Sequence, residues 1–207
     1  MKTGLVVEGG GMKCAYSAGI LDRFLDEHIT FDYCIGVSAG SANTASYLAG
    51  QRGRNRRFYV EHLMEPGYMG VKNLLRTGQF FGLQYIYATL TNSDGADPID
   101  YPAIVANSAE FELVATDAAT GKAAYFNKDD MKQDDYRAIL DNRHLMYRQN
   151  IADVKKHEAA GESLVFAPSR ELKMSTYARN IKLEEELYDL GISDFDARLE
   201  ELHAFLS

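Results

Sequence analysis

A pentapeptide of the Gly-x-Ser-x-Gly type constrains the fold of this chain more than any other feature. Residues 33–35 predict a short strand that runs directly into the sequence GVSAG at 36–40, and small residues then predict a helix over 39–50. Serine in such a turn takes a strained backbone conformation, and the glycines on either side avoid collisions with the neighbouring strand and helix. The pattern predicts a nucleophile elbow with Ser38 at its tip.

A run of three glycines precedes this elbow. Residues 2–8 predict a first strand, with no charge between Thr3 and Val7, that ends at Gly9, Gly10 and Gly11; a helix follows over 12–28. The uncharged strand is typical of a central position in a parallel sheet, with both faces covered. The two strand-to-helix turns supply what acyl transfer needs, a nucleophile and backbone N–H groups for the oxyanion.

The glycine run also allows a dinucleotide-binding turn, because Gly9-x-Gly11 follows a strand and opens a helix. Cys14 stands where that fingerprint has glycine, however, and no Gly-Lys-Ser/Thr follows to form a phosphate loop. We therefore expect no cofactor. Cys14 and Cys34 lack the spacing of a metal or redox site, so we expect both to be reduced packing residues and expect no metal.

Composition fits one α/β domain spanning residues 1–207. The 207 residues are 46% hydrophobic, enough for one sizeable core. The formal net charge of −8 disfavours binding to nucleic acid. The sequence shows neither a basic-then-apolar leader nor an apolar run approaching the roughly 18 residues that span a bilayer, so we expect a cytoplasmic protein.

Two stretches in the first half allow alternative readings. Four arginines lie in a predicted helix over 52–64, where they fit a solvated helix start or a contact with anionic lipid headgroups: Arg52, Arg54, Arg56 and Arg57. The aromatic, glycine-interrupted segment 66–90 fits ordinary core, or an acyl-chain pocket or lid beside the nucleophile.

The second half of the chain predicts a mixture of strands and helices. Residues 110–115 and 123–127 predict a hairpin, and residues 163–167 predict a last strand stopped by Pro168. The predicted helices span 130–158, which is unusually long, then 181–190 and 194–206, the last two separated by Gly191 with Ser193 as N-cap.

These motifs resemble the patatin-like phospholipase family, in particular its small bacterial members. The resemblance rests on GGGMK at 9–13 and GVSAG at 36–40 and covers almost the whole chain; further similar text lies at 32–33, 46–54, 68–70, 73–78, 116–121 and 187–191. It implies a three-layer α/β/α fold with a mostly parallel central sheet and a helical C-terminal appendage. It also implies a hydrolase of phospholipids or related acyl esters, with peripheral contact at the inner face of the membrane.

The resemblance implies a Ser–Asp dyad. Ser38 would be the nucleophile, and the N–H groups of Gly10 and Gly11, helped by Gly9, would form the oxyanion hole. Lys13 matches the basic position after the family's glycines, whereas Cys14 replaces a glycine.

The family's catalytic aspartate has no counterpart in this sequence. It belongs to an Asp-Gly-Gly/Ala motif on a late strand, and a block resembling that region is missing near 139–140. Asp94, in the sequence Asp-Gly-Ala, fits a turn. Asp117 ends a predicted strand, but the resemblance places it outside the dyad; both are weak candidates. The late histidines lie on predicted amphipathic helices, where they fit surface positions: His144, His157 and His203. The alternative function is therefore a non-catalytic lipid- or partner-binding protein that keeps the fold.

Overall fold

The fold is built on a four-stranded, mostly parallel sheet. The computed structural model describes residues 2–116, 120, 122–130, 154–177 and 179–207. The strands lie in the order β1 (Gly4–Val7), β2 (Tyr33–Val37), β3 (Glu110–Thr116) and β4 (Ala123–Asn127). The first three are parallel, and β4 runs antiparallel to β3, as the predicted hairpin requires.

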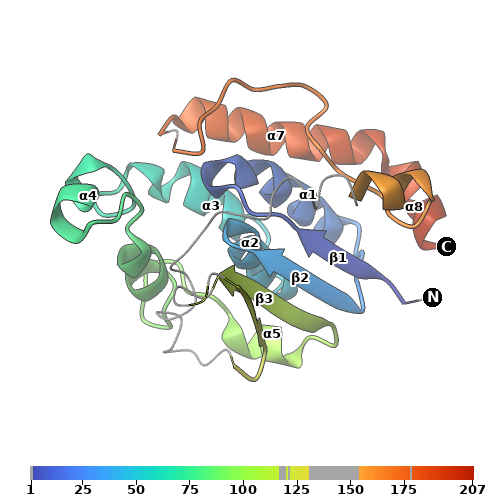
Figure 1. Cartoon of the computed structure of the whole chain (residues 1–207), viewed down its shortest axis with the longest axis horizontal. Coiled ribbons are helices and arrows are strands. Elements are labelled where there is room, and N and C mark those ends of the chain that lie inside the picture. Colours follow the sequence, from blue (N-terminus) through green and yellow to red (C-terminus); the bar gives the residue numbers. More distant parts are fainter. Residues whose placement is uncertain (1, 117–119, 121, 131–153, 178) are drawn as a thin grey trace.

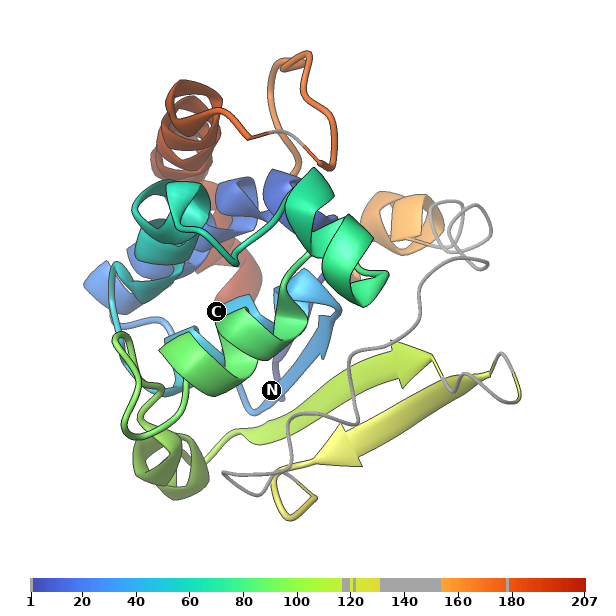
Figure 2. The same cartoon turned by 90° about the vertical axis from the view of Figure 1, so that its left-hand side faces the viewer.

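Helices surround this sheet, which confirms the predicted α/β class. In the described ranges they are η1 (Gly11–Cys14), α1 (Ala15–Asp26), α2 (Ala39–Leu48), α3 (Arg54–Val60), η2 (His62–Met64), α4 (Val71–Thr77), η3 (Tyr85–Leu90), α5 (Tyr101–Ala106), α7 (Ile181–Ala197) and α8 (Leu199–Leu206). Helix α2 packs on β2, α1 packs on α2, and α7 lies along α1 as the outermost helix (Figure 1). Figure 2 shows the same helices on one side of the hairpin formed by β3 and β4.

The core lies between α2 and one face of the sheet. Because side chains alternate along a strand, Cys34, Phe111 and Leu113 point to this face and are buried. Cys34 and Phe111 are partners in the register of β2 and β3. Val6 points to the other face and is 73% exposed.

The prediction of a central first strand was wrong for the described sheet. Strand β1 pairs with β2 alone and forms the edge. Its uncharged sequence reflects the burial of Val7 against the helices rather than cover on both faces.

The predicted strand at 163–167 was also wrong. Phe166 stacks on Phe195 at 5.8 Å between ring centroids, and the carbonyl of Val165 accepts a hydrogen bond from Arg198. The apolar residues of this segment pack on α7, and the backbone forms no strand ladder.

The prediction that Gly191 separates two helices was wrong, because α7 continues from Ile181 through Gly191 to Ala197. A Cβ on Gly191 would overlap the carbonyl oxygen of Tyr16, and one on Gly19 would overlap that of Tyr188. Gly191 therefore serves close packing of α7 on α1, and Ser193 lies inside the helix.

The long helix predicted over 130–158 falls largely outside the described residues. Residues 154–159 are helical. Within the part of the chain that the structure describes, no helix combines the length and the apolar character needed to cross a bilayer.

Candidate active site

The turn at Ser38 has the geometry of a nucleophile elbow. Strand β2 ends at Val37 and α2 begins at Ala39. Ser38 between them has φ 55° and ψ −124°, a backbone conformation that a residue with a Cβ rarely adopts. A Cβ on Gly36 would lie 2.5 Å from the Cα of Ser41. A Cβ on Gly40 would overlap the carbonyl oxygens of Val7 and Glu8. The turn therefore requires glycine at both flanking positions.

The glycine run lies directly against this elbow. A Cβ on Gly9 would lie 2.8 Å from the carbonyl oxygen of Val37 and 2.9 Å from the Cβ of Ser38. Because β1 and β2 are parallel neighbours, their carboxyl ends meet at one edge of the sheet. Gly11 has φ 59°, which lets the chain turn into η1 immediately after this contact. The two turns that the sequence predicted therefore meet at one place.

Asn43 fastens the glycine turn to α2, a role that the sequence did not reveal. Its side-chain amide donates to the carbonyl of Cys14 at 2.9 Å and to the hydroxyl of Ser17 at 3.0 Å. Its Oδ1 accepts from the hydroxyl of Tyr59 at 3.0 Å. Asn43 and Tyr59 are both buried. Their hydrogen bonds fix the position of η1 relative to α2.

The two cysteines are buried and free, as predicted. The thiol of Cys14 faces the carbonyl of Glu8 at 3.6 Å, so this side chain fits beneath the glycine turn. Burial raises the pKa of the Cys34 thiol to about 12, which keeps it protonated and unreactive.

No described carboxylate or imidazole is hydrogen-bonded to the Ser38 hydroxyl. Asp94 is exposed in a turn after η3, as its sequence predicted, and Asp117 lies outside the described residues. His157 is exposed beside Glu162, His203 is exposed on α8, and His144 is not among the described residues. The general base of the site is therefore not identified by the described geometry.

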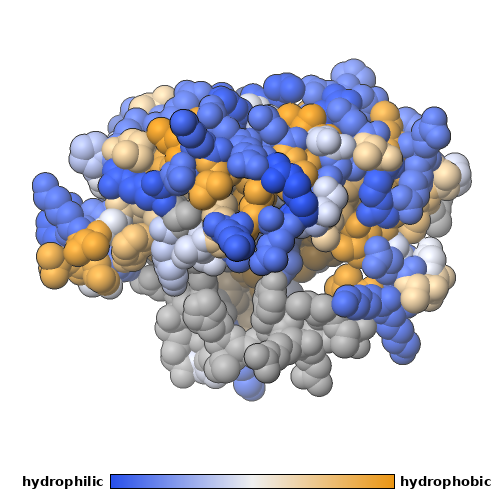
Figure 3. Space-filling view, turned by 90° about the horizontal axis from the view of Figure 1, so that it is seen from above, coloured by the Kyte–Doolittle hydropathy of each residue, from blue (hydrophilic) through white to orange (hydrophobic). Residues whose placement is uncertain are grey.

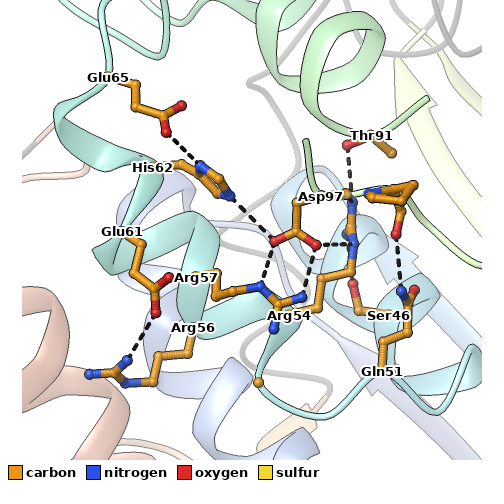
Figure 4. A network of polar contacts seen from close by, with 12 residues as sticks. Ser46, Gln51, Arg54, Arg56, Arg57, Glu61, His62, Glu65, Thr91 and Asp97 are labelled. Carbon is orange, nitrogen blue, oxygen red and sulfur yellow. Dashed lines mark hydrogen bonds and ion pairs between the residues drawn. The ribbon is translucent and has the colours of Figure 1, made fainter. Parts of the chain in front are cut away.

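Each of the four arginines of the basic cluster pairs with a carboxylate, and the Arg52 side chain is nevertheless 53% exposed. Arg57 binds both oxygens of Asp97, at 2.6 and 2.8 Å, and buried Arg54 lies 3.5 Å from the same group (Figure 4). Burial raises the pKa of Asp97, but the two guanidinium groups and His62 outweigh it and hold that pKa below its usual range. Arg52 pairs with Asp26, and Arg56 with Glu61 and Glu185.

Glu184 is a second polar group that the sequence did not single out. It lies in the first turn of α7 with 0% exposure, and neither carboxyl oxygen has a hydrogen-bond partner among the described residues. Burial raises its pKa to about 9. Burial is also the main cause that raises the pKa values of the Tyr59 and Tyr68 hydroxyls. Glu184 is therefore a neutral acid behind the Asn43 anchor.

A cavity of about 220 Å³ lies away from this site. It is lined by residues that include Phe31, Tyr47 and Asn107, which precede β2 and β3 or lie late in α2. It therefore opens at the amino end of the parallel strands, opposite Ser38. Within the described ranges, no group of three or more His, Cys, Asp or Glu side chains is placed to hold a metal ion.

The sequence matches a known family over nearly its whole length. Residues 5–202 match the family described as patatin-like phospholipase. Among curated proteins, the chain is similar to the uncharacterized protein YjjU of Escherichia coli (strain K12), with 26% identity over 161 residues. That alignment covers 75% of this chain and 39% of the relative, so the chain spans well under half of the relative's length.

Proposed function

Because this chain belongs to the patatin-like phospholipase family, we propose that it is a serine acyl-ester hydrolase that removes fatty acyl groups from phospholipids or related lipid esters. The observation that carries the proposal is the contact between the two turns. Gly9 lies against Ser38, and Ser38 has the positive φ of a nucleophile elbow. A nucleophile and a row of backbone N–H groups at one sheet edge are suited to acyl transfer.

In this mechanism, the hydroxyl oxygen of Ser38 attacks the ester carbonyl carbon as a base removes its proton. The carbonyl oxygen becomes negatively charged and accepts hydrogen bonds from the N–H groups of Gly10 and Gly11. Collapse of this intermediate breaks the ester bond; the alcohol leaves with a proton, and the acyl group remains on Ser38. Water then attacks the acyl-enzyme, releasing the fatty acid and restoring the serine.

The base in this proposal is an aspartate, as the family resemblance implies. A general base contributes roughly 10²–10⁴-fold to such a step. Asp94 is exposed in its turn and is the weaker of the two candidates. Asp117 follows β3, whose carboxyl end lies at the same sheet edge as Ser38 because β2 and β3 are parallel.

Substitution of the nucleophile tests the proposal. The wild-type protein is expected to hydrolyse p-nitrophenyl acyl esters and to be labelled by a fluorophosphonate probe, whereas Ser38→Ala should do neither. Ser41→Ala is the matched control, since Ser41 lies in the first turn of α2, just after Ser38, and its hydroxyl donates to the carbonyl of Gly36 at 2.7 Å. Equal hydrolysis by wild type and Ser38→Ala would disprove the assignment.

A second candidate function is a non-catalytic lipid-binding protein. The observation that favours it is that no described carboxylate or imidazole is bonded to the Ser38 hydroxyl. This function predicts binding to liposomes that survives Ser38→Ala, with no turnover at any protein concentration. Release of fatty acid from the same liposomes, dependent on Ser38, would exclude it.

A further inference from the structure

Helix α4 is polar toward the protein and apolar toward solvent. Its apolar residues Leu75, Val71 and Leu74 are 84%, 64% and 45% exposed. They recur at spacings of three and four, so they share one helix face. A surface helix of a soluble protein ordinarily places such a stripe against the core.

The polar residues of α4 explain this orientation. The side-chain amide of Asn73 donates to the carbonyl of Gly67 at 2.8 Å, and it is the helix's least exposed residue. The hydroxyl of Thr77 donates to the carbonyl of Asn73 at 2.8 Å. Asn73 thus marks the inner side of α4, whereas Thr77 is exposed and bonds within the helix, and no residue of α4 is buried.

Backbone hydrogen bonds between residues 68–70 and 80–82 hold α4 in its outward position. The N–H of Gly70 donates to the carbonyl of Phe80 at 2.9 Å, and the N–H of Gly82 donates to the carbonyl of Tyr68 at 2.8 Å. Figure 1 shows α4 at one extreme end of the molecule. In Figure 3 hydrophobic side chains gather at that same left-hand end.

The charge around α4 is opposite to that of the chain as a whole. Residues 66–93 contain Lys72 and Arg76 and no Asp or Glu, in a chain of net charge −8. Both cations are exposed, and neither forms an ion pair with a described carboxylate. They follow the apolar residues by one position each, along one side of the apolar face. An apolar face bordered by cations matches the surface of a bilayer that contains anionic lipid.

The α4 surface is joined to the glycine turn of the site. The ring of Tyr177 lies 5.4 Å from that of Phe80, at the base of α4, and is exposed beside it. The preceding residue, Thr176, accepts a hydrogen bond at its carbonyl from the N–H of Met12 at 3.3 Å. Met12 directly follows Gly9, Gly10 and Gly11.

From this geometry we infer that α4 docks the protein on the surface of an anionic lipid bilayer, with Val71, Leu74 and Leu75 entering the headgroup region and Lys72 and Arg76 contacting lipid phosphates. Docking there holds the glycine turn next to the lipid. The inference deepens the proposed function, on which its biological meaning rests, but the binding itself does not require catalysis.

Vesicle binding tests the inference without turnover if every protein carries Ser38→Ala. The probes are vesicles of phosphatidylcholine alone and vesicles that also contain phosphatidylglycerol. The parent protein is expected to sediment with the anionic vesicles, and Val71→Gln/Leu75→Gln to bind at least tenfold more weakly. Lys72→Gln and Arg76→Gln should each weaken binding to the anionic vesicles about fivefold and reduce its salt dependence.

The matched control is Val105→Gln on α5, which replaces a valine that is 53% exposed and should leave binding unchanged. Melting temperatures within a few degrees of the parent check that each variant is folded. No binding by the parent, or equal binding by Val71→Gln/Leu75→Gln, would overturn the inference. Dissociation of a dimer by that variant in sedimentation velocity, with vesicle binding unchanged, would assign the surface to a second copy and also overturn it.

The two proposals fail separately. Hydrolysis of a soluble ester without vesicle binding would support the hydrolase proposal and disprove the docking surface. Vesicle binding that depends on α4, without hydrolysis by the Ser38-containing protein, would support the docking surface and disprove the hydrolase proposal.

Discussion

Gly9 is the residue on which the proposed chemistry depends most closely, because its missing side chain lets the glycine turn contact the turn at Ser38. Gly9→Ala would place a Cβ 2.8 Å from the Val37 carbonyl oxygen and 2.9 Å from the Ser38 Cβ. One of the two turns must then shift. Loss of one oxyanion donor costs about a hundredfold or more in rate, so we expect kcat on p-nitrophenyl esters to fall by at least that factor.

Gly4→Ala is the control for this prediction, since a Cβ at that position of the same strand would have only an ordinary contact, 3.8 Å from the Tyr33 carbonyl oxygen. Its kcat should stay within about twofold of wild type. A Gly9→Ala protein with undiminished kcat would show that the glycine turn takes no part in the reaction.

Glu184 makes the free energy of unfolding depend on pH in a direction opposite to that of an ordinary salt-bridged acid. Burial raises its pKa to about 9 in the folded protein from the usual 4.5. Between these values the folded state binds a proton that the unfolded state has released. The stability must therefore fall as pH rises, by up to about 1.4 kcal/mol per pH unit from this group.

Glu184→Gln should remove that slope, because its amide does not titrate. We expect the variant to gain stability relative to wild type as pH rises from 5 toward 9, as measured by urea unfolding at several pH values. Glu186→Gln, an exposed neighbour on α7 that pairs with Arg170, should retain the wild-type slope. Parallel pH profiles for Glu184→Gln and wild type would mean that the carboxyl group is charged in the folded state.

At the scale of elements, the packing of α7 on α1 depends on two facing glycines. Alanine in place of a helical glycine ordinarily stabilises a protein by about 1 kcal/mol. In Gly191→Ala the new Cβ would overlap the Tyr16 carbonyl oxygen, so we expect the opposite sign, a loss of about 2 kcal/mol in the free energy of unfolding. Stabilisation in urea unfolding would show that the two helices can separate without cost.

The elements show which sequence signals were sufficient. The two turns could be placed from the sequence because glycines flank Ser38 and a glycine run follows the first predicted strand, although Gly9 itself is required by its contact with Val37 and Ser38. Gly191 is required by close contact with α1, which is distant in sequence. The local rule that a glycine ends a helix therefore wrongly predicted a helix end there. Residues 163–167 have strand-like composition, but Phe166 packs on Phe195 and no strand partner is present among the described residues.

The sequence predicted the two turns but not the buried polar side chains around them. Asn43 was missed because its bonds to Cys14 and Tyr59 are created only by the tertiary fold. Glu184 was missed because its burial on α7 likewise depends on the tertiary fold. The ion pairs of the arginine cluster were not predicted for the same reason, since carboxylate partners such as Asp97 and Glu185 are distant in sequence.

Over the whole molecule, charge is distributed so that one end differs from the rest. The arginines near α3 pair with carboxylates, whereas Lys72 and Arg76 of α4 are exposed in a segment, residues 66–93, that contains no Asp or Glu. A negatively charged bilayer would repel most of a −8 chain and attract this end. In the proposed docking, this charge pattern would orient the molecule and the apolar face of α4 would supply the contact.

A general base for Ser38 would have to be brought to it by the complete fold. The pH dependence of Ser38 labelling by a fluorophosphonate tests whether such a base is present. With an aspartate of ordinary pKa, near 4, the labelling rate should level off above about pH 5, because the base is then ionised. A serine without a base would react through its alkoxide, and its rate would rise about tenfold per pH unit up to pH 9. Asp94→Asn should keep the wild-type profile, since Asp94 is exposed in a turn. Asp117→Asn should convert the plateau into the rising line if Asp117 is the base, and an unchanged plateau would assign that role to another carboxylate.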